Sequence, residues 1–131
     1  MPKNLSVLVV DDDLEIRRLF ADILELSGHH IAFAVDGEEA VQIVSRGDRH
    51  FDLVFLDYMM PGGDGFCVLE RLHAIEPRLQ VVLVTGEKRI CEAPCPGPVR
   101  PLARLSKPFS LDALEALIEQ VAAQEPLVRP G

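Results

Sequence analysis

The sequence predicts an α/β domain built on a five-stranded parallel sheet with helices on both faces. Short apolar runs alternate along the chain with segments whose apolar residues recur at helical spacing. Glycine and proline mark several junctions between these segments. The first run, Leu5–Val10, is apolar at nearly every position, which is typical of a strand buried on both faces. Strand–helix alternation of this kind favours right-handed crossovers and a doubly wound sheet.

Size and composition limit the classes of function. The 131 residues fit one domain, and 48% of them are hydrophobic, which is enough for a core. We expect a folded domain over residues 1–124, with a frayed tail or the start of a linker at 125–131. The net charge of −8 disfavours a general nucleic-acid-binding surface, so we expect no direct contact with nucleic acid.

The same sequence shows no apolar run near the roughly 18 residues that span a bilayer, and no signal-peptide core at its start. We therefore expect no membrane association. The three cysteines are an odd number, which disfavours a disulfide framework and favours a cytoplasmic protein.

The first half of the chain contains three predicted strands and two helices. The glycines at 28 and 47 supply the helix stops. The predicted elements are a strand Leu5–Val10, a helix from Leu14, a strand His30–Val35, a helix opened by a capping box of Asp36 and Glu39, and a strand Phe51–Asp57.

The second half contains two further strands and two regular helices. They are a helix over Phe66–Ile75 stopped by Pro77, a strand within Leu79–Gly86, a strand Leu102–Ser106, and a last helix capped by Ser110. The segment Glu87–Pro101 holds four prolines, each of which removes a backbone donor and clashes with the preceding turn. We therefore expect at most a short helical turn near Arg89–Ala93.

Polar residues stand at the carboxyl ends of the predicted strands, which is where parallel α/β sheets have their functional sites. Asp11 and Asp12 follow the first strand, Asp57 ends the third, Thr85 ends the fourth and Lys107 follows the fifth. Each residue alone has an ordinary interpretation, such as a helix cap, a turn former or a solvated charge. Gathered together, however, the carboxylates would resist ionising beside one another. Lys107 can supply one compensating cation, and Mg²⁺ suits the oxygen ligands as a second.

Four sequence pieces carry a family resemblance. They occur in the order "VLVVDDD", "LVFLDYMMPGGDG", "VVLVTG" and "SKPF". The pattern D-x-x-M-P-x-x-D-G is complete in Asp57, Met60, Pro61, Asp64 and Gly65. With these pieces the chain resembles, over nearly its whole length, the receiver domain of two-component response regulators. The resemblance implies a flavodoxin-like sheet of order 2-1-3-4-5.

The resemblance also implies a role for each site residue. Asp57 would accept a phosphoryl group from the histidine of a histidine kinase or phosphotransfer protein. Asp11 and Asp12 would hold Mg²⁺ together with Asp57, and the backbone carbonyl of Met59 would complete the protein ligands. This chemistry agrees with the known use of carboxylate nucleophiles in phosphoryl transfer.

Four further expectations follow from the resemblance. Thr85 and Lys107 would contact the phosphoryl oxygens, and the Lys107–Pro108 bond would be cis. Asp13 would lie outside the metal ligands and cap a helix. Asp64 would shape the loop after the third strand rather than take part in chemistry.

The chain departs from the family at two places. Arg104 occupies the position, three residues before Lys107, where the family commonly has an aromatic residue that turns inward on phosphorylation. A guanidinium does not readily enter an apolar slot, so this residue argues against the usual switch. The prolines of Glu87–Pro101 shorten the fourth helix. We therefore expect an atypical output.

The resulting hypothesis is a phosphoacceptor that promotes its own phosphorylation and dephosphorylation, rather than an enzyme, and signals to an unknown downstream protein by conformational change. One alternative is a receiver-like interaction module whose output is atypical or independent of phosphate. A Mg²⁺-dependent phosphohydrolase is another, although so short a chain leaves little room for substrate-binding residues. The sequence leaves open whether the domain stands alone or is a fragment of a larger protein.

Overall fold

The computed structural model describes residues 4–60 and 63–123 and confirms the predicted parallel sheet. Five strands pair in the order β2-β1-β3-β6-β7, all parallel, which is the predicted order 2-1-3-4-5 once a small separate hairpin is set aside. The elements are β1 (Ser6–Val10), α1 (Leu14–Leu26), β2 (His30–Ala34), α2 (Gly37–Arg46), β3 (Leu53–Asp57), β4 (Met59–Met60), β5 (Gly63–Asp64), α3 (Gly65–Ile75), β6 (Gln80–Thr85), α4 (Lys88–Glu92), β7 (Ala103–Ser106) and α5 (Leu111–Ala122).

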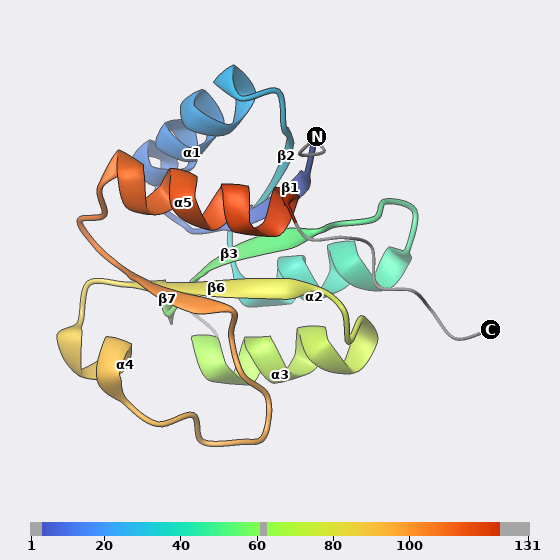
Figure 1. Ribbon diagram of the computed structural model, residues 1–131. Helices are drawn as coiled ribbons and strands as arrows, with labels where there is room; N and C mark the ends of the chain where they lie inside the picture. The colour runs from blue at the N-terminus through green and yellow to red at the C-terminus, as the bar shows by residue number, and fades with distance from the viewer. Residues whose placement is uncertain (1–3, 61–62, 124–131) are drawn as a thin grey trace.

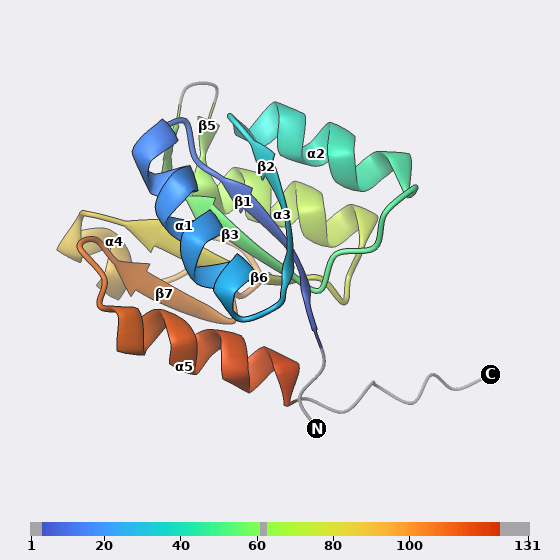
Figure 2. The same cartoon turned by 90° about the horizontal axis from the view of Figure 1, so that it is seen from above.

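Helices cover both faces of the sheet (Figures 1 and 2). α1 and α5 lie on one face, while α2 and α3 lie on the other with α4 beside them. Two apolar clusters fill the spaces between the layers. Successive residues of β1 point to opposite clusters, so that Leu8 packs with α2 and α3 whereas Val9 packs with α1 and α5. Burial on both faces explains why the strand sequences are continuously apolar.

The predicted helix caps are present. Asp36 Oδ1 accepts a hydrogen bond from the Glu39 backbone N–H at 2.8 Å. Glu39 Oε1 in turn accepts from the N–H of Val35 at 3.0 Å, one residue before the donor that a standard capping box uses. Ser110 caps α5 through the N–H of Ala113. These bonds satisfy backbone donors that the first turn of a helix leaves unpaired.

Element ends differ from the sequence prediction by one or two residues. The sequence predicts strands that include Leu5 and Phe51, but the first and third strands begin after them, at Ser6 and Leu53. Both side chains are nonetheless buried, Leu5 in the cluster under α1 and α5 and Phe51 in the cluster under α2 and α3. Apolar residues in the sequence indicate which side chains are buried. Here buried side chains extend beyond the residues that pair within the sheet.

The structure contains a small hairpin that the sequence did not predict and a short fourth helix that it did. The loop after β3 contains the hairpin β4–β5, in which Met59 pairs with Asp64. The proline-rich segment contains only the five-residue helix α4, as expected from its prolines. Pro61 of the sequence motif and the tail at 125–131 lie outside the described residues. Within residues 4–60 and 63–123, none of the helices has the length and apolarity needed to cross a bilayer.

Candidate functional site

Four distant segments meet at the carboxyl ends of the central strands. Asp57 is the last residue of β3 and pairs in register with Val84 of β6. The next N–H, that of Tyr58, donates to the Val84 carbonyl at 2.9 Å. The N–H of Lys107 donates to the Thr85 carbonyl at 2.7 Å, which brings the residue after β7 to the end of β6. The predicted site residues therefore lie at one rim of the sheet.

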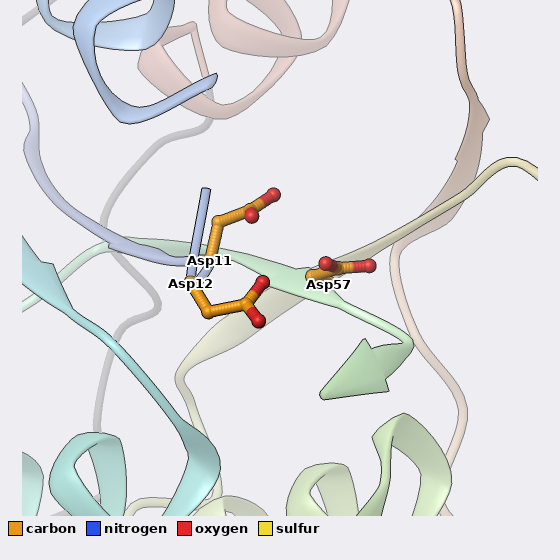
Figure 3. Close-up of side chains that lie close together, drawn as sticks. All are labelled: Asp11, Asp12 and Asp57. Carbon is orange, nitrogen blue, oxygen red and sulfur yellow. The ribbon is translucent and has the colours of Figure 1, made fainter. Parts of the chain in front are cut away.

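Three carboxylates gather at this rim (Figure 3). Asp11, Asp12 and Asp57 each offer one oxygen, and these oxygens lie within 4.8 Å of one another. Asp11 and Asp57 are buried, with 2% and 7% of their surfaces exposed, whereas Asp12 is exposed. The cluster therefore combines two desolvated carboxylates with one that faces water.

Lys107 supplies the cation that the sequence predicted for this cluster. Its Nζ lies 3.1 Å from Asp11 Oδ2, to which it donates a hydrogen bond, and 3.5 Å from Asp57 Oδ2. A quarter of its side chain remains exposed. The Lys107–Pro108 peptide bond is cis, as expected.

The surroundings of Asp57 and Lys107 favour the protonated form of both side chains. Burial raises the pKa of Asp57, the charge of Asp11 raises it further, and Lys107 offsets only part of this effect. Burial alone would lower the pKa of Lys107, but the charges of Asp57 and Asp11 outweigh it, so that this pKa is raised. Lys107 is thus firmly protonated, and the ionised form of Asp57 lacks full compensation.

The donor set fits a hard divalent cation. Three carboxylate oxygens and solvent access beside Asp12 are what Mg²⁺ requires, because it takes few carboxylates and keeps several waters. A cation there would also compensate the charge that Lys107 leaves unbalanced. The structure therefore brings together the three carboxylates that the sequence proposed as metal ligands.

Asp13 is not a member of this cluster. Its Oδ1 accepts from the Glu15 N–H at 2.9 Å and caps α1, as predicted, while its own N–H donates to Asp11 Oδ1. Asp64 has a similar role on another helix. Its Oδ1 caps α3 through the N–H of Cys67, which is more specific than the predicted shaping of a loop.

The remaining predicted residues lie beside the cluster. Thr85 is buried. Its Oγ1 accepts a hydrogen bond at 3.0 Å from the N–H of Glu87, the N-cap of α4. The N–H of Met59 donates to Asp57 Oδ1 at 3.2 Å and helps to orient the carboxylate. Metal binding by the Met59 carbonyl and phosphoryl contact by Thr85 remain predictions.

Two arginines have contacts that sequence reasoning missed. Arg17 Nη1 donates to the Asp11 carbonyl at 3.1 Å, which places a second cation close to the cluster. The only feature of the sequence that indicated this contact is that Arg17 lies six residues after Asp11, in the first turns of α1.

Arg104 is half-buried, and its guanidinium lies among backbone carbonyls rather than in an apolar slot. It donates to the carbonyls of Ile90, Cys91 and Ala93, and its Cζ lies 5.4 Å from the ring centroid of Phe66. These carbonyls replace water around the charge of the guanidinium.

Comparison with known proteins identifies a family. A family model described as "Response regulator receiver domain" matches residues 7–119. The chain is 34% identical over 127 residues to the transcriptional regulatory protein TcrA of Mycobacterium tuberculosis, a match that covers 97% of this chain and 49% of TcrA. It is 28% identical over 117 residues to sporulation initiation phosphotransferase F of Bacillus subtilis, which covers 89% of this chain and 93% of that protein.

A solved structure agrees with these matches. The response regulator protein TrrA of Thermotoga maritima, in complex with Mg(2+)-BeF, is 27% identical, with a TM-score of 0.77 over 89% of this chain and 98% of that chain. The chain spans half or less of the length of several curated transcriptional regulators that it matches.

Proposed function

Because the chain belongs to the response regulator receiver domain family, and is therefore a two-component phosphoacceptor, we propose that Asp57 is the residue that receives the phosphoryl group. The observation that carries this proposal is the meeting of Asp57 with Asp11, Asp12 and Lys107 at one rim of the sheet. Asp57 ends a buried central strand, so its backbone is fixed, and its carboxylate lies at the rim beside the exposed Asp12.

The contacts of Asp57 suit a nucleophile. One of its oxygens accepts the N–H of Met59, and the other lies beside Lys107 Nζ. The attacking carboxylate oxygen forms the new P–O bond while the P–N bond of a phosphohistidine breaks, and the bonding electrons stay with the histidine nitrogen. The ammonium of Lys107 is placed to stabilise negative charge on the transferred group, since charge stabilisation and positioning dominate phosphoryl transfer.

Receiver domains typically bind Mg²⁺, and we assign that role here to Asp11, Asp12 and Asp57, with the Met59 carbonyl as a fourth ligand. When bound, the cation would neutralise charge on the phosphoryl oxygens. The chain's own part is to hold the carboxylates within reach of one another and to leave Asp12 open to water.

Thr85 connects the site to the rest of the domain. Its hydroxyl accepts from the N–H of Glu87, the N-cap of α4. A hydroxyl recruited by a phosphoryl oxygen leaves that N–H, and the start of α4 loses one of its anchors. This change is the conformational signal that we propose for an as yet unidentified downstream protein.

The partners follow from the family. Receiver domains interact with histidine kinases or phosphotransfer proteins, and we propose such a donor for this chain. We further propose that the domain promotes its own phosphorylation and dephosphorylation without acting as an enzyme on other substrates, acts in the cytoplasm, and does not contact nucleic acid itself. The comparisons do not favour the alternative of an interaction module that has abandoned phosphate.

Intact mass measurement after incubation with acetyl phosphate and Mg²⁺ tests the assignment of Asp57. We expect the wild-type protein to gain one phosphoryl group, Asp57→Asn to gain none, and omission of Mg²⁺ to suppress the gain. Asp22→Asn, which removes an exposed carboxylate of α1, is the matched control and should behave as wild type. Undiminished phosphorylation of Asp57→Asn would refute the assignment.

A further inference from the structure

The proline-rich segment builds a groove at the end of the sheet opposite the carboxylate cluster. One wall is the turn that follows α3, and the other is the segment that leads into β7. The Leu102 N–H donates to the Val81 carbonyl at 2.8 Å and joins the two walls at their base. In Figure 1 this segment runs from α4 past α3 before it enters β7. The groove has a volume of about 550 Å³.

The groove is lined by bases and by no acid. Arg78, Arg100 and His73 all line it, and all three are exposed. No Asp or Glu lines it, although the chain has 21 acidic and 13 basic residues. Among the described residues, neither Arg78 nor Arg100 is in an ion pair with a carboxylate. We call the site formed by these three residues and their apolar neighbours the basic groove.

Apart from Gln80, the rest of the basic groove is apolar, and prolines constrain its backbone. Pro77, Pro98 and Pro101 contribute rings with fixed backbone torsions, and Val99 packs against the core cluster beneath α3. Arg104 holds the start of the same segment through the carbonyls at the end of α4. A wall that is already ordered loses little entropy when a ligand binds.

We propose that the basic groove binds an extended, acidic segment of a partner protein. Carboxylates of that segment meet Arg78 and Arg100, and its apolar side chains lie against the proline rings. Charge complementarity selects this partner, because Arg78 and Arg100 form no ion pair with a carboxylate among the described residues, although Arg100 Nη1 donates to the Gly97 carbonyl and the Arg78 N–H donates to Glu76. The proposal goes beyond phosphoacceptance, since the groove lies at the amino ends of β6 and β7, away from Asp57.

Nucleic acid is disfavoured as the occupant. A polyanion is repelled by the net charge of the whole molecule. Single strands also rely on aromatic side chains for base stacking, and no Phe, Tyr or Trp lines the groove. Three basic groups around an apolar wall suit a mixed acidic and apolar peptide better.

Fluorescence polarisation with a fluorescein-labelled dodecapeptide of alternating glutamate and leucine tests this proposal on the unphosphorylated full chain. We expect saturable binding that weakens roughly tenfold in the double variant Arg78→Glu/Arg100→Glu, where two attractions become repulsions. The control Arg18→Glu/Arg46→Glu makes the same change in net charge at two exposed arginines elsewhere, and should bind within about twofold of wild type.

Two further probes complete the experiment. A peptide with glutamine in place of glutamate should bind at least about tenfold more weakly, and a single-stranded oligodeoxythymidine should not compete. An absence of saturable peptide binding, an equal loss in the control variant, or competition by the oligonucleotide would each overturn the proposal. Both double variants should still gain phosphate from acetyl phosphate, so failure here is separable from failure at Asp57.

Discussion

At the scale of single residues, three consecutive aspartates take three different roles. Asp11 is buried and bonded to Lys107, Asp12 faces water and points its carboxylate at the cluster, and Asp13 caps α1. The chain changes from extended to helical backbone at this point, so neighbouring side chains point in different directions. Sequence reasoning can therefore separate the three residues only by reference to the strand end and the helix start.

The pair Asp12→Ala and Asp13→Ala separates metal binding from helix capping. In the wild-type protein, Mg²⁺ at about a hundredfold above its Kd should raise the free energy of unfolding by about 2.7 kcal/mol. Asp12→Ala should lose most of this gain while keeping the metal-free stability, because Asp12 is exposed. Asp13→Ala should lose about 1 kcal/mol of metal-free stability and keep the gain.

Urea unfolding with and without Mg²⁺ measures both quantities. Because the chain has one tyrosine, Tyr58, directly after Asp57, and no tryptophan, its fluorescence gives a second readout near the site. An Asp13→Ala protein that lost its response to Mg²⁺ as fully as Asp12→Ala would place Asp13 among the ligands and contradict the assignment.

At the scale of elements, α4 is stabilised by hydrogen bonds from neighbouring elements, because it is too short to be stable alone. A five-residue helix is not stable on its own propensity. Thr85 anchors its start through Glu87, and Arg104 binds the carbonyls at its end. The position where the family commonly has a mobile aromatic residue is therefore occupied here by a residue that binds α4.

Arg104→Met should release this end of α4. The substitution keeps apolar bulk against Phe66 but removes the hydrogen bonds to the helix, so we expect a loss of roughly 1–2 kcal/mol in the free energy of unfolding. Hydrogen exchange should quicken over residues 88–101 and stay unchanged in α5. The control Arg89→Met removes only an exposed pair with Glu87 and should leave exchange nearly unchanged. Equal effects of both variants would show that Arg104 is no anchor.

The contact of α2 with α3 depends on a glycine. A Cβ at Gly37 would lie 2.5 Å from Val68 Cγ2, closer than packed atoms allow. Gly37→Ala should therefore cost about 1–3 kcal/mol, in spite of the better helix propensity of alanine. The double variant Gly37→Ala/Val68→Ala should lose less than the sum of its two single variants in urea unfolding. Strict additivity would mean that the two side chains do not compete for the same space.

The sequence predicted the type and order of the main elements because these depend on local pattern. Continuous apolar runs identified the strands, proline limited α4, and capping residues marked helix starts. Three features escaped prediction, namely the β4–β5 hairpin, the contact of Arg17 with Asp11, and the half-buried position of Arg104. Two of these are contacts of a side chain with the backbone of another element, and the third is a pairing too short to carry a pattern. No local periodicity encodes them.

At the scale of the whole molecule, Lys107 connects the two ends of the chain. Its bond to Asp11 spans 96 residues and joins the segment after β7 to the end of β1 across the central strands. The pKa of Asp57 is raised, so folding favours its protonated form, and the contribution of this group to stability is present at low pH and is lost as the pH rises through that raised value. The pKa of Lys107 is also raised, so its contribution persists through neutral pH and is lost only in strongly alkaline solution.

Lys107→Met removes this compensation and should act most strongly where the carboxylates are ionised. At neutral pH without metal we expect the variant to lose roughly 1–3 kcal/mol, because Asp11 and Asp57 are left buried without their cation. The deficit should shrink as the pH falls and protonates Asp57, and Mg²⁺ should reduce it at neutral pH by supplying charge of the same sign. Urea unfolding across the acid range, with and without Mg²⁺, measures this dependence. Lys88→Met, which removes an exposed lysine at the start of α4, should show no such trend. A deficit that is constant with pH would mean that Lys107 stabilises the fold by packing rather than by balancing the carboxylates on which phosphoryl transfer is proposed to depend.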